Sequence, residues 1–84
     1  MFSFKGVTGR NIYKLRRKRN WTRCQLAARV RILGCFMTAK IVSDIEQLKV
    51  HATDKQIVFV AEALGVELDE LFIFNKQIWN VVLD

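Results

Sequence analysis

The sequence predicts a compact all-α domain of four to five helices, and three observations support this. Apolar residues recur every three or four positions along most of the chain, which is the period of an amphipathic helix. Two segments open with threonine-x-x-glutamine, a pattern that caps helix N-termini. The 84 residues include no Pro and four Gly, and 51% of them are hydrophobic. This composition fits one small helical domain and argues against a disordered tail.

The first two expected helices lie in the basic part of the chain. Residues 9–19, GRNIYKLRRKR, place Ile12 and Leu15 on one apolar stripe surrounded by basic side chains. A second helix should follow Thr22, because the side chains of Thr22 and Gln25 can each satisfy a backbone N–H at a helix start. The inner face of this helix is expected to consist of Leu26, Ala27 and Val30.

Three further segments complete the predicted fold. Thr38 is expected to cap the segment TAKIVSDIEQ, whose apolar residues are Ile41, Val42 and Ile45. Thr53 and Gln56 repeat the capping pattern, and Gly65 is placed to end that helix in a left-handed cap. The predicted buried residues of this helix are Ile57, Val60, Ala61 and Leu64. The segment ELDELF is expected to form a short last helix that turns inward Leu68, Leu71 and Phe72.

Residues 73–84, IFNKQIWNVVLD, are too apolar for a solvated terminus. Short apolar runs do not distinguish a helix from a strand by their period, so both remain open for this extension. In either form it must pack on the domain or on a second copy of the chain, because a large exposed apolar patch usually marks an interface. The candidates for a dimer contact are Phe74, Ile78, Trp79 and Val82.

Charge is distributed unevenly along the chain. Residues 1–43 contain eleven Lys or Arg and no acid, whereas residues 44–84 contain three basic residues and eight acids, which together give the net charge of +6. Such asymmetry suggests a polyanion as partner, and nucleic acid is the strongest candidate because its phosphates reward clustered cations by counterion release. A solvated basic face is the alternative, and charge alone does not decide between the two.

Other function classes find little support in the residues. Cys24, Cys35 and His51 match no zinc-ligand spacing, so we expect two thiols of hydrophobic character, a surface His and no metal site. No nucleophile–base pair, paired carboxylates or Gly-rich phosphate loop occurs, which argues against an enzyme, a cofactor and a small-molecule substrate. No secretory signal and no apolar run long enough to cross a bilayer is present. A reduced, cytoplasmic setting and no membrane partner are therefore expected.

Five sequence blocks follow one another along the chain: the basic run KLRRKR, the capped segment TRCQLA, the segment ending in VSDIE, the segment AEALGV and the final LDELF. Their order resembles the Cro/C1-type (XRE) family of helix-turn-helix DNA-binding proteins. The blocks fall within residues 9–72, which leaves residues 73–84 as a C-terminal extension of one domain, 1–84. The resemblance implies a bacterial or phage transcription regulator, expected to be a repressor, that binds double-stranded DNA as a homodimer without a cofactor.

The same resemblance implies a division of labour between two helices. The second helix of such domains crosses the phosphate backbone, and the third enters the major groove with its N-terminus first. The implied phosphate contacts are Arg16, Arg17, Arg19, Thr22, Arg23, Thr38, Gln47 and Lys49. Matching VSDIE to the family pattern makes Val42 and Ile45 buried and turns four base-contact candidates outward: Ala39, Lys40, Ser43 and Asp44.

Two backbone features depart from the family pattern. The connection RILGCFM, residues 31–37, is longer than usual, so we expect the second helix to continue to near Gly34. Phe36 and Met37 are then expected to pack the connection. Leu48 stands where the family usually has Gly, and we expect a different loop there, because a left-handed Leu costs about 1 kcal/mol or more.

Two side chains also depart from what is usual. Trp21 takes the position of a buried family leucine, which favours the core over a stacking platform for single-stranded nucleic acid. Asp44 stands where Arg, Gln or a small residue is common. Its carboxylate can accept from a cytosine amino group, or it can form a surface ion pair with Lys40, or the helix no longer contacts bases.

Two rival functions therefore stay open beside a sequence-specific DNA-binding regulator. One is a protein-interaction module, such as an antitoxin-like or anti-repressor partner, that keeps the fold and binds DNA weakly. The other is a non-specific nucleic-acid binder driven by the KLRRKR run, which would show a steep salt dependence and little difference between sequences.

Overall fold

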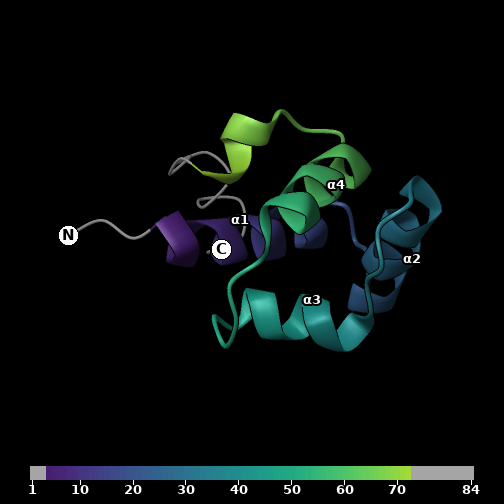
Figure 1. Cartoon of the computed structure of the whole chain (residues 1–84), viewed down its shortest axis with the longest axis horizontal. Helices are drawn as coiled ribbons and strands as arrows, with labels where there is room; N and C mark the ends of the chain where they lie inside the picture. The colour runs from purple at the N-terminus through teal and green to yellow at the C-terminus, as the bar shows by residue number, and fades with distance from the viewer. Residues whose placement is uncertain (1–3, 73–84) are drawn as a thin grey trace.

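The computed structural model describes residues 4–72, with side chains from residue 7 onward, and shows an all-α fold (Figure 1). The helices are α1 (Phe4–Lys18), α2 (Arg23–Leu33), α3 (Ala39–Glu46) and α4 (Asp54–Leu64), followed by the short 3-10 helix η1 (Leu68–Leu71). No strand occurs within residues 4–72. The predicted fold class is confirmed, although α1 begins before the predicted residue 9.

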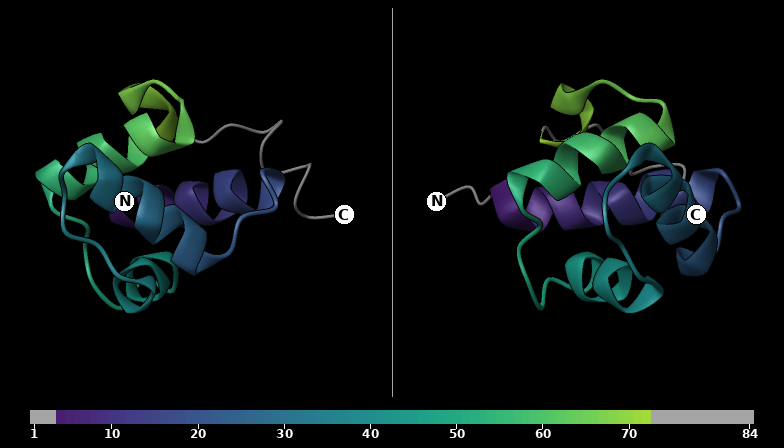
Figure 2. Two further views of the ribbon diagram at one scale, coloured as in Figure 1. Left: turned by 90° about the vertical axis from the view of Figure 1, so that its right-hand side faces the viewer. Right: turned by 45° about the vertical axis from the view of Figure 1, so that its right-hand side comes forward.

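The helices are arranged around α1. In Figures 1 and 2, α3 lies on one side of α1 and α4 with η1 on the other, while α2 stands at one end and packs against both α3 and α4. Asn11 on α1 is fully buried and donates hydrogen bonds from Nδ2 to the carbonyl oxygens of Glu70 and Leu71, at 3.2 Å each. These bonds tie η1 to α1. Helix α3 lies along the opposite side of α1.

The helix ends form where their sequences predict. Thr22 and Thr53 each make the complete capping box with the glutamine three residues later. Thr38 caps α3 by accepting a hydrogen bond from a backbone N–H of the first turn. Gly34 and Gly65 follow α2 and α4 in the left-handed conformation, with φ of 110° and 71°. Since an N-cap of this kind contributes about 1 kcal/mol, these local signals account for the positions of three helix starts.

The core is built mainly from the predicted inner faces of the four helices, with Cys35 and Met37 from the connection after α2 and Leu71 from η1. Its buried hydrophobic residues are Ile12, Leu15, Leu26, Ala27, Val30, Cys35, Met37, Val42, Ile45, Ile57, Val60, Ala61, Leu64 and Leu71. Phe72 packs against this cluster, as predicted. The prediction for Leu68 was wrong, because the chain reaches the core only at the end of η1 and leaves Leu68 39% exposed.

The connection between α2 and α3 confirms one prediction and corrects another. Helix α2 does continue to Leu33 and is followed by Gly34. Met37 is fully buried, but Phe36 is 73% exposed and does not pack the connection. The chain after Gly34 is not helical, and burial alternates along it: Cys35 and Met37 are buried, whereas Phe36 between them is exposed.

The turn after α3 also differs from the prediction. Leu48 adopts the left-handed conformation, with φ of 62°, that we expected a branched residue to avoid. A Cβ atom added to Gly9 would lie 2.8 Å from Leu48 Cδ2 and would overlap the carbonyl oxygen of Ile45. Helix α1 therefore carries no side chain where the end of α3 crosses it. Leu48 lies over Gly9 and stays 48% exposed, in a conformation that costs a residue with a Cβ about 1–2 kcal/mol.

We predict that Gly9→Ala loosens the contact between α1 and α3. The added methyl group collides with backbone atoms that cannot rotate away, so the free energy of unfolding should fall by roughly 1–3 kcal/mol in urea titration. Arg10→Ala, at the exposed neighbouring position of the same helix, is the control and should change it by less than about 0.5 kcal/mol. Equal stability of the two variants would contradict the close approach.

Candidate nucleic-acid interface

Helix α3 has a buried face and an outer face. Val42, Ile45 and Glu46 are each at most 3% exposed and point toward α1 and α2. Lys40 lies on the outer face, with 83% of its side chain exposed. The other three base-contact candidates, Ala39, Ser43 and Asp44, are half-buried. The structure thus sets Val42 and Ile45 inside, as predicted, and leaves the proposed base contacts on the side away from the core.

A buried carboxylate joins three helices. Glu46, at the end of α3, accepts from Arg16 Nε at 2.6 Å and from Arg16 Nη2 at 3.0 Å. It also accepts from Arg23 Nε, at the start of α2, at 3.0 Å. Arg16 Nη1 donates further to the carbonyl oxygen of Trp21 at 2.7 Å. Because Arg16 and Arg23 come from α1 and α2, this cluster locks α3 against both helices.

Arg16 must be removed from the predicted phosphate contacts. Only 6% of the residue is exposed, and three of its N–H groups are bonded within the protein. The physical reason is its place on α1: it follows Ile12 by four residues and so extends from the same buried face. A guanidinium on that face requires a carboxylate, and Glu46 supplies one.

A cationic hollow lies at the start of α2, beside α3. Arg23 keeps 36% of its side chain exposed while bonded to Glu46. Arg17 is exposed, and its Nη1 donates to Tyr13 Oη at 3.0 Å. The residues that line this shallow hollow are Tyr13, Arg16, Arg17, Thr22, Arg23 and Cys24. Because the backbone N–H groups of a helix start also favour anions, the hollow combines two features that attract phosphate.

Tyr13 concentrates positive charge at this hollow. Four cationic groups lie between 5.5 and 5.9 Å from the centre of its ring: those of Arg10, Lys14, Arg16 and Arg17. The electron-rich face of a phenol ring is attracted to such groups, which offsets part of their mutual repulsion. The sequence analysis assigned no role to Tyr13. The signal for one was its position directly before the basic run KLRRKR.

The other predicted phosphate contacts occupy varied environments. Gln47 and Lys49 are exposed just after α3. The hydroxyl oxygens of Thr22 and Thr38 already accept helix-capping bonds, but each hydroxyl proton can still be donated. Arg19 is half-buried, and its Nη1 donates to the carbonyl oxygen of Leu15 at 3.2 Å. The dimer-contact candidates Phe74, Ile78, Trp79 and Val82 lie outside the described residues.

Lys40 and Asp44 form an ion pair on the outer face of α3. Lys40 Nζ donates to Asp44 Oδ2 at 2.8 Å, one helical turn along. This hydrogen bond lowers the pKa of Asp44 below its usual value, and the charges of Lys40 and Lys49 add to the effect. Of the alternatives for Asp44, the surface pair is therefore present, and it sets a donor and an acceptor side by side.

Arg29 and Arg31 make contacts within the folded domain. Trp21 is half-buried and packs against the core, as predicted, with the Arg29 guanidinium 4.1 Å from the centre of its ring. This cover excludes Trp21 as an open stacking platform. Arg31 Nη1 donates to the carbonyl oxygen of Met37 at 2.8 Å and so holds the connection that leads into α3.

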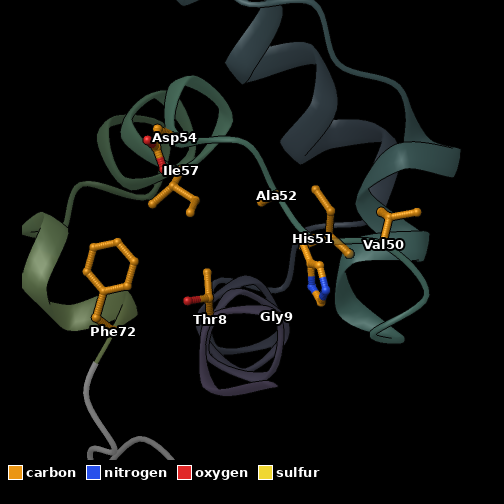
Figure 3. A pocket seen from close by; sticks show the side chains of 9 residues that line it. Thr8, Gly9, Val50, His51, Ala52, Asp54, Ile57 and Phe72 are labelled. Atoms are coloured by element: carbon orange, nitrogen blue, oxygen red, sulfur yellow. The ribbon is translucent and has the colours of Figure 1, made fainter. Parts of the chain in front are cut away.

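A cavity of about 180 Å³ lies behind the end of α3 (Figure 3). It is lined by Thr8, Gly9, Ile45, Val50, His51, Ala52, Asp54, Ile57 and Phe72. Its volume is below the roughly 300–1,000 Å³ of typical ligand pockets, and its lining is mostly apolar. We interpret it as a packing gap that surrounds the close contact of Gly9 with α3.

The described part of the chain contains neither a cluster of metal ligands nor a helix that could span a membrane. Cys24 is exposed, Cys35 is buried and His51 is exposed. Within residues 4–72, no three His, Cys, Asp or Glu side chains gather closely enough to hold a metal ion. In the same range, every helix is too short or too polar to cross a bilayer.

Comparison with known proteins identifies a family. A family model described as helix-turn-helix matches residues 12–71, from within α1 to the end of η1. The matched region contains the whole of α2 and α3, the Arg16–Glu46–Arg23 cluster and the hollow. Neither the curated proteins nor the solved structures yielded a match.

We predict that Glu46→Gln destabilises the fold strongly. Loss of the carboxylate leaves two guanidinium groups without their counter-charge, one of them buried, and breaking a buried pair costs about 3–5 kcal/mol. Asp44→Asn makes the same chemical change two residues away, on an exposed pair, and should leave the urea midpoint almost unchanged. A small and equal effect of both substitutions would show that the cluster does not hold the helices together.

The second prediction for α3 concerns the titration of Asp44. Replacing Lys40 by Ala should raise the pKa of Asp44 toward its usual value of 3.8, and Lys49→Ala should raise it less. Carbon-detected NMR titration of the carboxyl group measures both shifts. Because the folded pKa is the lower one, the pair stabilises the fold above pH 3.8, and this contribution is lost as pH falls through the folded value. No change in Lys40→Ala would rule out the pair in solution.

Proposed function

Because the chain belongs to the helix-turn-helix family, in its Cro/C1 (XRE) type, we propose that it binds double-stranded DNA sequence-specifically as a homodimer and represses transcription. The family consists of DNA-binding regulators. A bacterial or phage origin is part of this proposal. So is a cytoplasmic location, because a protein with this role acts on the chromosome.

One observation carries the proposal. Helix α3 and the first turn of α2 lie side by side, joined by the Arg23–Glu46 pair (Figures 1 and 2). A helix placed in the major groove would then bring the hollow at the start of α2 onto the neighbouring phosphates. Arg17 and Arg23 would grip those phosphates as charge-assisted donors. Base contacts and backbone contacts thus come from one continuous surface.

The outer face of α3 would supply the base contacts. Lys40 can donate to guanine O6 and N7, Ser43 can donate or accept, and Asp44 can accept from the amino group of cytosine. In the unbound protein Lys40 and Asp44 satisfy each other. A DNA site must therefore offer partners to both groups, and a site that offers only one leaves a charged group unpaired. The Lys40–Asp44 ion pair would therefore increase the discrimination between DNA sequences and lower the affinity for DNA.

The same pair also favours a second candidate, a protein-interaction module that retains the fold. Lys40 is the one cation of α3, and Asp44 neutralises it. A module of this kind would bind DNA weakly and with a shallow salt dependence, because the cationic hollow alone would contribute.

We predict that a random duplex library, selected at near-physiological salt, yields an enriched palindromic motif. The double variant Lys40→Ala/Ser43→Ala should lose it, since each lost base contact removes about 1–3 kcal/mol of discrimination. Lys55→Ala is the matched control: Lys55 is exposed at the second position of α4, as Lys40 is in α3. It should keep the motif.

The other outcomes of this selection are equally clear. Enrichment of the same motif by the double variant would show that α3 does not contact bases. No motif, with affinity that falls steeply with salt and vanishes in Arg17→Ala/Arg23→Ala, would identify a charge-driven binder. Weak binding with little salt dependence would favour the interaction module.

A further inference from the structure

The far end of α2 carries exposed apolar side chains that the proposed DNA contact does not use. Ile32 and Leu33, in the last turn of α2, are 82% and 37% exposed, and Phe36, in the connection that follows, is 73% exposed. Val58 on α4 is 48% exposed. We call the hollow formed by Arg29, Ile32, Leu33, Glu62 and Ala63 the α2–α4 end face. Apolar groups gathered in this way mark an interaction surface.

The polar groups of this face are complementary in charge. Arg29 from α2 and Glu62 from α4 line one hollow together with Ile32, Leu33 and Ala63. Arg29 lies over the Trp21 ring and makes no ion pair with Glu62. Helix α2 contains no acid, so this end of α2 offers positive charge and the adjoining part of α4 offers a carboxylate.

A surface with this pattern is complementary to itself. If two copies meet about a two-fold axis, Arg29 of each copy can face Glu62 of the other, and the same ion pair forms twice. Ile32 and Leu33 of both copies would lie around the axis between these pairs. Apolar groups at the centre with charged groups at the rim are the usual composition of a stable protein interface.

The position of the face is compatible with DNA binding. Helix α2 has 11 residues, so its far end lies roughly 16 Å from the first turn that borders the cationic hollow. In the left panel of Figure 2, α2 is in front, with α3 at the lower edge and α4 above. The longest dimension of the molecule is 30 Å, so copies placed side by side would set their α3 helices a similar distance apart. Successive major grooves on one side of a duplex recur at about 34 Å.

We propose that the α2–α4 end face is the contact through which two copies of this chain associate. The proposal rests on the proposed homodimer and assigns its contact to the α2–α4 end face instead of residues 73–84. It also accounts for the segment RILGCFM, residues 31–37, in which several apolar side chains are not buried in the core.

The test is sedimentation equilibrium of the full chain without DNA. Wild type should dimerise, and Ile32→Asp should weaken the dimer by about tenfold or more, because it buries a charge at the centre of the contact. Val50→Asp, at an apolar position outside the face that is 46% exposed, is the control and should dimerise like wild type. Far-ultraviolet circular dichroism checks that each variant folds.

A charge exchange tests whether the partner is a second copy. Glu62→Arg alone should weaken the dimer, and the double variant Arg29→Glu/Glu62→Arg should restore it, since both pairs reform with reversed sign. Failure of the double variant to recover would contradict the cross-pairing. A wild type that stays monomeric at its highest soluble concentration, or a dimer lost in Trp79→Ser but kept in Ile32→Asp, would overturn the proposal.

Binding to a single half-site duplex separates this proposal from the proposed function. Ile32→Asp should bind one half-site as wild type does, because α3 and the hollow are unchanged. If half-site binding is normal and the dimer is unaffected by Ile32→Asp, only the contact is wrong. If no duplex binds any variant, the DNA-binding function fails, whereas the dimer measurement retains its meaning.

Discussion

The buried carboxylate of Glu46 is the constraint on which the arrangement of the helices depends. A carboxylate removed from water is costly unless its oxygens are bonded, and here two guanidinium groups from two other helices bond it. Movement of α1 or α3 would leave a charged group unpaired inside the protein, and movement of α2 would break the Arg23–Glu46 hydrogen bond. Among residues 4–72, no buried side-chain nitrogen or oxygen lacks a hydrogen-bond partner. The outer face of α3 is therefore presented at a fixed angle, as base contact requires.

The positive charge of the chain has two different uses. Arg16 is paired with Glu46, Arg29 lies over the Trp21 ring, and Arg31 donates to a carbonyl oxygen of the connection to α3. These three charges stabilise the fold. Arg17 and Arg23 face the hollow at the start of α2. The first half of the chain thus contains more basic residues than can contact phosphate. In the proposed complex, a small set of donors placed beside α3 supplies the backbone contacts, and the total charge mainly steers association.

The limits of sequence-based prediction follow from the range of each interaction. Capping boxes and apolar stripes involve residues within one or two turns, so the helix starts and most core residues could be predicted. Arg16 could not, because its partner Glu46 lies 30 residues away. Glu46 itself offered a signal, since it follows Val42 by four residues on the inner face. Leu48 lies over Gly9, which is 39 residues earlier in the chain, and Phe36 is exposed between two buried neighbours; the local pattern indicates neither feature.

The central claim is that the outer face of α3, held in place by Glu46, meets DNA. Backbone amide NMR of the labelled chain, titrated with its selected duplex and with an unrelated duplex, tests this most directly. The account predicts that the largest shifts occur at Lys40, Ser43 and Arg23 with the selected duplex, while η1 on the other side of α1 stays unchanged. Shifts of equal size with both duplexes, or shifts centred on η1 with none in α3, would contradict it.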